Sequence, residues 1–274
     1  MTRFEFERWD EGRLIVNRDE ADLLRANGLT TFESIMGHQG GTLAKNLLRE
    51  RTTTQISLPD NNGSARTYFL KRHRPSPWKE YLKPLLRATW PILGARNEWQ
   101  AIIRFQECGI STMIPVALGE SGRHSFLMTK AIEGCTKLTR WMANHAVQRR
   151  NGDARETRRI IAQVAGIART MHAAGMHHQD FYLTHFLVPD ANPEQSVYVI
   201  DLGRARKHRH LSHRWIVKDL AQLDYSAHLA TRTERGRFLA EYLGRSLCAE
   251  DRPLIRRIRR KSAAIARHSR KNRL

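Results

Sequence analysis

The sequence predicts an α+β protein of two lobes, with a β-rich lobe over residues 1–132 and a mainly helical lobe over residues 133–274. Short runs rich in β-branched and aromatic residues recur through the first half of the chain. Apolar residues at helical spacing dominate the second half. Because the pattern changes near residues 132–137, we place the boundary between the lobes there.

Five strands are predicted in the first lobe, each bounded by turn residues. They cover residues 13–17, 52–58, 66–72, 112–118 and 125–130. The turn cluster Pro59–Gly63 follows the second strand, and Gly119–Gly122 joins the last two. In the third strand, alternation with a period of two places Phe69 and Lys71 on one face and Tyr68 on the other.

Helical periodicity predicts most of the remaining elements. In the first lobe, a helix over Arg96–Cys108 ends at Gly109. In the second lobe, Asp153 and Glu156 have the spacing of a capping box, and an apolar helical stripe follows as far as Gly175. Two short β runs and three further helices complete the chain, at 186–188, 197–202, 215–228, 234–243 and the basic C-terminus.

The charge balance favours polyanionic partners. Lys and Arg number 47 against 27 Asp and Glu, which gives a net charge of +20. Nucleic acid, an anionic membrane face and a phosphorylated substrate all suit such a balance. Cys108, Cys135 and Cys248 have neither disulfide nor paired metal-ligand spacing, so we expect a cytoplasmic protein. We expect no signal peptide and no membrane span, because no apolar run reaches ~18 residues.

Two acidic residues carry the functional prediction. Asp180 lies in a loop after a long helix, and Asp201 ends a later β run that continues into Gly203. A carboxylate at Asp180 can orient an acceptor hydroxyl and take its proton, and one at Asp201 can hold Mg²⁺ against nucleotide phosphates. Either Asp alone would more often cap a loop or strand. Together and in this order, they resemble the catalytic loop and metal-binding segment of protein-kinase-like enzymes.

Three charged residues elsewhere fit the same layout. Lys71 ends a strand and resembles the lysine that binds nucleotide phosphates, with Glu98 on the following helix as its candidate partner. The alternatives are a solvated lysine and a carboxylate favoured at a helix start. Asp219 is predicted to anchor the catalytic-loop backbone, or else to be a plain helix-start carboxylate. It follows Asp201 by only 18 positions, which leaves little room for a peptide-docking segment and favours a small-molecule or glycan acceptor.

Two features depart from the protein-kinase pattern. His185 stands five residues after Asp180, where an Asn normally binds a second metal ion. Neutral imidazole is a poor ligand for Mg²⁺, so a phosphate contact and support of the loop are alternatives to a metal role. No G-x-G-x-x-G motif occurs, and Gly37, Gly40 and Gly41 are either a phosphate-covering turn or ordinary turn glycines.

These segments together resemble the lipopolysaccharide core heptose kinases of the Kdo/heptose lipopolysaccharide kinase family, from about Tyr68 to Tyr242. The motifs that carry the resemblance are Tyr68-Phe69-Leu70-Lys71, Trp78-Lys79-Glu80, Pro91-Ile92-Leu93-Gly94-Ala95-Arg96-Asn97-Glu98-Trp99, Met171-His172-Ala173-Ala174-Gly175, His178-Gln179-Asp180, His185-Phe186-Leu187, Ile200-Asp201-Leu202, Arg214-Trp215 and Lys218-Asp219-Leu220. A His at position 185 is itself characteristic of that family.

The resemblance implies an ATP-dependent carbohydrate kinase with a protein-kinase-like fold, which uses Mg²⁺ and phosphorylates a heptose hydroxyl of the lipopolysaccharide inner core at the cytoplasmic membrane face. Gln179 replaces the usual Arg, and Gly203 stands where a His is expected. Kdo, a second heptose or another small molecule therefore remain alternative acceptors. The implied roles are catalysis for Asp180, nucleotide binding for Lys71, Glu98 and Asp201, metal binding for Asp201 and His185, and loop support for His178 and Asp219.

Basic segments suggest further contacts. Arg204, Arg206 and Lys207 are predicted to meet an anionic glycan, unless they form a plain charged loop. The segment Arg252–Leu274 carries ten Lys or Arg and no acidic residue, which suits either an amphipathic helix on anionic lipid or a solvated final helix. A nucleic-acid-binding protein and a non-catalytic scaffold are the rival interpretations. Scattered aromatic residues disfavour the first, and intact candidate catalytic residues disfavour the second.

Overall fold

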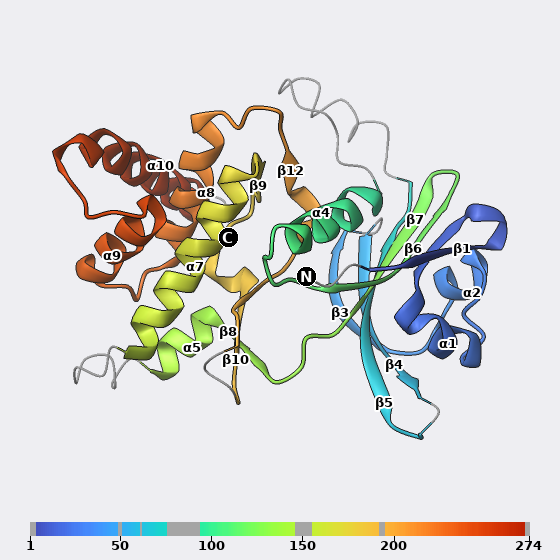
Figure 1. Cartoon of the computed structure of the whole chain (residues 1–274). Coiled ribbons are helices and arrows are strands. Elements are labelled where there is room, and N and C mark those ends of the chain that lie inside the picture. The colour runs from blue at the N-terminus through green and yellow to red at the C-terminus, as the bar shows by residue number, and fades with distance from the viewer. Residues whose placement is uncertain are drawn as a thin grey trace. The chain divides into compact units, whose positions relative to one another are not determined.

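The computed structural model describes residues 4–48, 51–60, 62–75, 94–145, 155–191 and 195–271 (Figure 1). The basic segment Trp78–Leu93 and the predicted cap at Asp153 lie outside these residues. The chain divides into two compact units, one of Met1–Glu107 and Met113–Ile132, the other of Cys108–Thr112 and Glu133–Leu274. The first unit is built on a large β-sheet and the second mainly on helices, which confirms the α+β class. The assignment of nucleotide binding to one lobe and of catalysis to the other stays a prediction.

The first unit contains an antiparallel sheet in the strand order β1-β2-β6-β7-β5-β4-β3. The strands are β1 (Phe6–Trp9), β2 (Leu14–Asn17), β3 (Thr42–Leu48), β4 (Arg51–Pro59), β5 (Ala65–His73), β6 (Ile114–Ser121) and β7 (His124–Lys130). In β5, Tyr68 is fully buried while Phe69 and Lys71 are half-buried, as the period-two pattern predicted. Gly119 lies inside β6 and not in the predicted turn. Glycine is required there because a Cβ would come within 2.2 Å of the Phe126 ring.

The N-terminal residues add a hairpin and two helices to this unit. β1 and β2 extend the edge of the sheet, and α1 (Arg18–Ala26) and α2 (Phe32–Met36) bury Leu24 and Ile35 in the same core as Tyr68. Glu20 in α1 is buried, and it accepts hydrogen bonds from the Tyr68 hydroxyl at 2.6 Å and from Lys130 Nζ at 3.1 Å. The sequence did not predict these helices, which cover the sheet that carries Lys71.

A further described helix of the first unit is α4 (Arg96–Glu107). Before it, Gly94 has a positive φ of 77°, and the Ala95 N–H donates to Ser125 Oγ at 3.0 Å. Its apolar face buries Ile102 and Phe105 completely. The helix therefore begins and ends as its sequence pattern predicted, within one residue.

The second unit contains five described helices, α5 (Leu138–Asn144), α7 (Arg155–Ala173), α8 (His213–Ser226), α9 (Arg232–Leu243) and α10 (Arg252–Lys271). Its described strands are β8 (Cys135–Lys137), β9 (Met176–His177), β10 (Phe186–Pro189), β11 (Tyr198–Val199) and β12 (Arg206–Lys207). They pair as β11-β10-β8 and as β12-β9. These two small sheets place the loops that begin at His178 and at Ile200.

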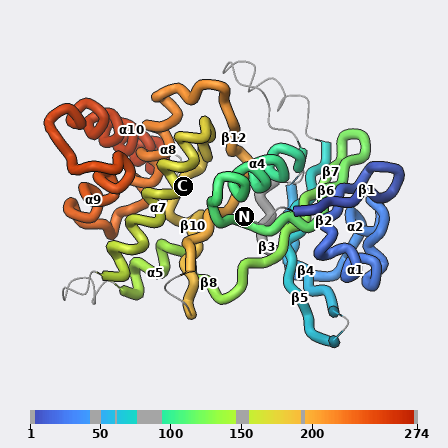
Figure 2. Tube along the Cα trace, viewed as in Figure 1, coloured from blue at the N-terminus to red at the C-terminus, as the bar shows by residue number. Residues whose placement is uncertain are grey.

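The basic C-terminal helix packs inside this unit. Its apolar residues Leu254, Ile258 and Ile265 lie against Leu220 and Ala221 of α8. Residues of α9 join the same cluster, and the three helices lie side by side (Figure 2). The amphipathic pattern of α10 is therefore explained by packing within the protein, and its Arg and Lys residues remain exposed.

Candidate active site

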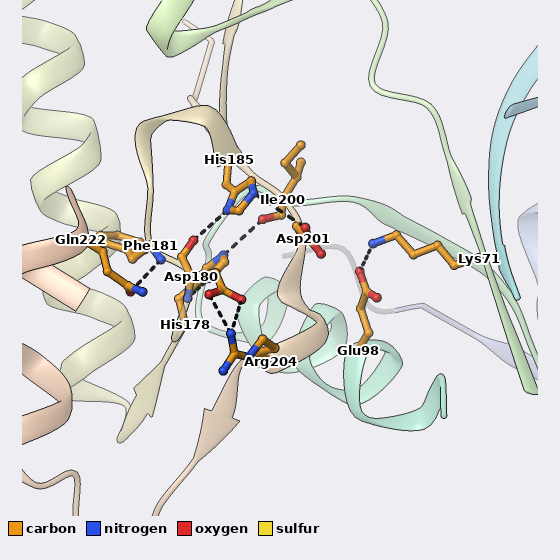
Figure 3. Close-up of polar contacts among 10 residues, drawn as sticks. All are labelled: Lys71, Glu98, His178, Asp180, Phe181, His185, Ile200, Asp201, Arg204 and Gln222. Carbon is orange, nitrogen blue, oxygen red and sulfur yellow. Dashed lines mark hydrogen bonds and ion pairs between the residues drawn. The ribbon is translucent and has the colours of Figure 1, made fainter. Parts of the chain in front are cut away.

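Asp180 stands on a loop between β9 and a 3-10 turn over Leu183–His185. The loop is held by His178, which is fully buried and has its pKa lowered by that burial, so that the ring is neutral. His178 Nδ1 accepts from the Asp180 N–H at 3.3 Å, and His178 Nε2 donates to the Ile200 carbonyl at 3.1 Å (Figure 3). One imidazole thus ties the Asp180 loop to the residue just before Asp201.

Asp219 holds the same loop from α8. Its fully buried carboxylate accepts from the backbone N–H of His178 at 2.8 Å and of Gln179 at 3.0 Å. Burial raises the pKa of this carboxyl, but the hydrogen bonds from His172 and from the loop backbone outweigh burial and hold the pKa below its usual value. Gln179 has a positive φ of 69°, a conformation that non-glycine residues rarely adopt. The carboxylate therefore stabilises a strained backbone directly before Asp180.

Two further residues of α8 hold the loop and were not predicted. Gln222 is buried; its Oε1 accepts from the Phe181 N–H at 3.2 Å and its Nε2 donates to the Gln179 carbonyl at 2.6 Å. Ser226 Oγ accepts from the Leu183 N–H at 2.9 Å. With Asp219, these residues recur at helical spacing on one face of α8. Polar residues at that spacing are the only signal in the sequence that points to them.

His185 and Asp201 form the second part of this site. His185 Nδ1 donates to the Asp180 carbonyl at 2.7 Å, and the Ile200 N–H donates to the His185 carbonyl at 2.9 Å. His185 Nε2 lies 3.7 Å from Asp201 Oδ2. The Asp201 carboxylate is about half-exposed, and its backbone is in the left-handed region at a φ of 62°. Within the second unit, the structure therefore brings Asp180, His185 and Asp201 together.

The basic residues after Asp201 have different environments. Arg204 Nη1 donates to both carboxylate oxygens of Asp180, at 3.1 and 3.4 Å. Arg206 and Lys207 form β12, which pairs with β9, and the Lys207 side chain is exposed. Of the three residues predicted to contact the glycan, Arg204 is hydrogen-bonded to the candidate catalytic carboxylate.

The first unit holds the Lys71–Glu98 pair. Lys71 Nζ lies 2.5 Å from Glu98 Oε1, which is buried at the start of α4. Lys71 is in register with Thr53 of β4 and Leu127 of β7, in the middle of the sheet. The ion pair thereby fixes the ammonium, and the two flanking strands fix the backbone of Lys71. The contact between these two side chains is the one the spacing predicted.

Gly41, directly ahead of β3, has a packing role. Gly41 has a φ of 129°, and a Cβ there would lie 2.2 Å from the Gln55 carbonyl. Gly41 precedes Thr42, which pairs with Gln55 at the open end of the β3–β4 hairpin. The close approach of β4 therefore accounts for glycine at this position without a phosphate contact.

Comparison with known proteins places the chain in a family. The model of the lipopolysaccharide kinase (Kdo/WaaP) family matches residues 41–242. The chain belongs to this family. It is 36% identical to a Pseudomonas aeruginosa protein named lipopolysaccharide core heptose(I) kinase WaaP over 232 residues, which is 81% of this chain and 83% of that protein. An Escherichia coli protein of the same name is 36% identical over 231 residues, or 80% of this chain and 84% of the relative.

A solved structure of the family also matches. It is titled "WaaP in complex with acyl carrier protein", has a TM-score of 0.69 and 29% sequence identity, and the match covers 96% of this chain and 99% of that chain. The predicted family resemblance, kinase class and protein-kinase-like fold are confirmed by these findings. Membership of a kinase family implies use of ATP. The roles of the individual site residues stay predictions.

Proposed function

We propose that this Kdo/WaaP-family kinase transfers the γ-phosphate of ATP to a heptose hydroxyl in the inner core of lipopolysaccharide. The proposal is supported by the relatives named as heptose(I) kinases over about four fifths of the chain. The observation that carries it is the hydrogen-bonded assembly of the second unit, in which His178 and His185 join the Asp180 loop to the Asp201 segment. Phosphoryl transfer needs little beyond such positioning and charge stabilisation.

In this proposal Asp180 is the catalytic residue. Its carboxylate orients the acceptor hydroxyl and takes the proton that leaves as the oxygen bonds to phosphorus. Asp219 and Gln222 hold the loop backbone on either side of Asp180 and thereby fix the direction of the carboxylate. In the first unit, Lys71 binds nucleotide phosphates while Glu98 fixes its ammonium.

Asp201 suits a divalent cation held partly by nucleotide. The described residues contain no group of three or more His, Cys, Asp or Glu that would hold a metal ion by themselves. Mg²⁺ is commonly coordinated by one or two carboxylates together with phosphate oxygens and water. The half-exposed Asp201 carboxylate is suited to be such a ligand. His185 Nδ1 donates to the Asp180 carbonyl and the other ring nitrogen, Nε2, lies 3.7 Å from Asp201 Oδ2, which makes His185 the candidate second ligand. When bound, Mg²⁺ would neutralise phosphate charge.

Labelled-phosphate transfer tests the proposed reaction. Purified protein is incubated with labelled ATP, Mg²⁺ and dephosphorylated core lipopolysaccharide, with Kdo, a synthetic heptoside and a protein acceptor in parallel. Mass spectrometry of the product then locates the phosphate. Label on heptose supports the proposal, and label confined to Kdo or to the protein acceptor contradicts it.

We also propose an acyl carrier protein as a partner, because the solved relative is titled as a complex with one. The second unit contains an apolar cavity of about 110 Å³, lined by residues such as Trp141, Ile160, Leu220 and Phe238. Such a cavity suits an acyl chain. Acylated carrier should raise the melting temperature more than unacylated carrier, and Val164→Phe, which fills the cavity, should remove the difference. Equal shifts by both carriers would contradict an acyl contact.

We propose that the protein acts at the cytoplasmic face of the inner membrane through charge alone. None of the described helices is long and apolar enough to span a membrane. The apolar side of α10 packs on α8, so its exposed Arg and Lys residues are what remains for anionic lipid. Flotation with anionic vesicles should weaken with salt and with joint replacement of Arg256, Arg260 and Arg267 by Gln. Salt-independent flotation would contradict it.

A further inference from the structure

A cationic platform lies on α8 beside the Asp180 loop. The Trp215 ring stacks in parallel on His177, with centroids 4.3 Å apart and an interplanar angle of 5°. Arg214 Cζ lies 4.7 Å and Lys218 Nζ 5.2 Å from the Trp215 centroid. Burial lowers the pKa of His177 to about 3, so this stacked ring is neutral and only Arg214 and Lys218 bring charge to the platform.

Lys218 is half-buried, which is costly for an ammonium without an anionic partner. Among the described residues it makes no hydrogen bond or ion pair, and its neighbour Asp219 uses its carboxylate on the loop backbone. Burial lowers the pKa of Lys218, and the charge of Arg204 lowers it further, while Asp180 acts in the opposite direction. Lys218 therefore lies within electrostatic reach of both the candidate base and Arg204.

Arg204 has donors to spare. Within the described part of the chain its hydrogen bonds to Asp180 run from Nη1 alone, so Nε and Nη2 remain able to donate. Lys261 of α10 also acts electrostatically on Lys218. Arg204 is thus bonded to the Asp180 carboxylate, and Lys218 lies within electrostatic range of Arg204, Asp180 and Lys261. Like charges repel one another, and a bound oxyanion would offset both that repulsion and the burial of Lys218.

We propose that Arg204 and Lys218 form a binding site beside Asp180 for an oxyanion carried by the acceptor glycan, with Lys261 adding positive charge. The inference rests on the proposed function and identifies how that acceptor is held. Kdo is a carboxylated sugar, and phosphate groups are the other oxyanions of such a glycolipid; both accept charge-assisted hydrogen bonds from guanidinium and ammonium groups. Anchoring the oxyanion positions a neighbouring sugar hydroxyl at the Asp180 carboxylate.

Acceptors that differ by one charged group test the inference. The full-length protein is assayed at saturating Mg·ATP with three soluble heptosyl-Kdo oligosaccharides: one with its carboxylate and phosphates intact, one with the carboxylate as methyl ester, and one without phosphates. In the wild type, masking the group that is bound should raise the KM for acceptor about 10- to 100-fold with a smaller change in kcat. The acceptor that loses affinity identifies the oxyanion.

Matched variants connect that loss to the site. Lys218→Met should abolish the discrimination between acceptors, Lys218→Arg should keep most of it, and the KM for ATP should change little in either. Lys137→Met removes the charge of an exposed lysine in β8 of the same unit and should behave as the wild type. Circular dichroism and thermal unfolding check that each variant is folded. If Lys218→Met does not fold, the comparison of Lys218→Arg with the wild type still tests the site.

Distinct results would overturn distinct claims. If the wild type phosphorylates all three acceptors with equal KM, the oxyanion site is wrong and the proposed function stands. If Lys218→Met raises the KM for ATP and leaves acceptor discrimination intact, the cations serve the nucleotide and the inference is also wrong. If no acceptor is phosphorylated, the proposed function fails and this inference fails with it.

Discussion

Replacing Gln222 by Leu tests how the loop that carries Asp180 is held, without changing Asp180 itself. The substitution keeps the approximate volume of a buried side chain on α8 but removes a hydrogen bond to the Tyr182 hydroxyl and two hydrogen bonds to the loop backbone. The two backbone bonds reach the Phe181 N–H and the Gln179 carbonyl, the groups that flank Asp180. The Gln222 side chain is buried and bonds the loop backbone, so it is a positioning residue.

The magnitude follows from the two backbone groups that lose their partner. Each buried group left unsatisfied costs about 1–3 kcal/mol, so Gln222→Leu should lower the free energy of unfolding by about 2–6 kcal/mol. The Gln179 backbone already has an unfavourable positive φ, and one of the bonds that hold it is removed. A displacement of Asp180 by ~1 Å should lower kcat by about 10²-fold.

The assay separates positioning from binding. We expect a large fall in kcat, little change in the dissociation constant of Mg·ATP by calorimetry, and a lower melting temperature. Gln222→Glu keeps an acceptor for the Phe181 N–H but loses the donor to the Gln179 carbonyl, so its kcat should lie between those of the wild type and Gln222→Leu.

Gln163 provides a matched control in the same unit. Its Oε1 accepts from the Val197 N–H at 2.8 Å and its Nε2 contacts the Gln195 carbonyl at 3.4 Å, away from the loop. Gln163→Leu should lower stability without a comparable fall in kcat. If Gln222→Leu and Gln163→Leu reduce kcat equally, or if Gln222→Leu keeps full kcat, the loop is not held as the structure implies.

Five other substitutions test the remaining residues. Asp180→Ala should abolish phosphate transfer and leave Mg·ATP binding largely intact by calorimetry, and near-wild-type transfer would remove Asp180 as the base. Asp201→Ala should weaken Mg²⁺-dependent nucleotide binding, and an unchanged affinity would refute its metal role. Lys71→Ala should lower kcat/KM by misplacing the phosphates, with Glu98→Gln causing a smaller loss; full retention would make Lys71 a surface charge. Asp219→Asn should destabilise the protein most above pH 4: because the pKa of Asp219 is depressed from 3.8, its stabilising contribution is present above that value and is lost as the pH falls through the lower folded pKa. A stability difference from wild type that does not narrow under acid would contradict this.

The order of motifs was enough to predict the Lys71–Glu98 contact in the first unit and the connection between the Asp180 and Asp201 segments in the second, because each of these residues lies near the end of an element with a strong local pattern. Lys71 lies two residues before the end of an alternating strand, Glu98 lies in the first turn of an amphipathic helix, and Asp180 follows a long apolar stripe. The element ends predicted for β5, α4 and α8 lie within a few residues of those observed.

The parts that sequence analysis missed depend on contacts distant in the chain. Helix α1 is short, and its buried Glu20 is explained only by Tyr68 and Lys130, which lie far along the sequence. Gln222 bonds to loop residues about forty positions earlier. Periodicity reports which face of a helix is apolar, but it does not report which backbone group a polar side chain will meet.

The two candidate catalytic carboxylates are positioned relative to each other by the second unit alone. His178 connects the Asp180 N–H to the Ile200 carbonyl, and His185 connects the Asp180 carbonyl to the segment before Asp201. Both acidic segments also contain a residue at positive φ, Gln179 and Asp201, and such residues persist only where neighbouring bonds fix them.

Changes in the first unit should therefore alter nucleotide affinity without altering the spacing of the carboxylates, whereas loss of either imidazole should alter both chemistry and metal binding. A substitution at His178 therefore tests how the two acidic segments are positioned, which a substitution of either carboxylate does not. His178→Ala removes no reacting group, yet on this reasoning it should lower kcat and Mg²⁺-dependent nucleotide binding together. If His178→Ala lowered only kcat or only nucleotide binding, the Asp180 and Asp201 segments would be positioned independently of each other.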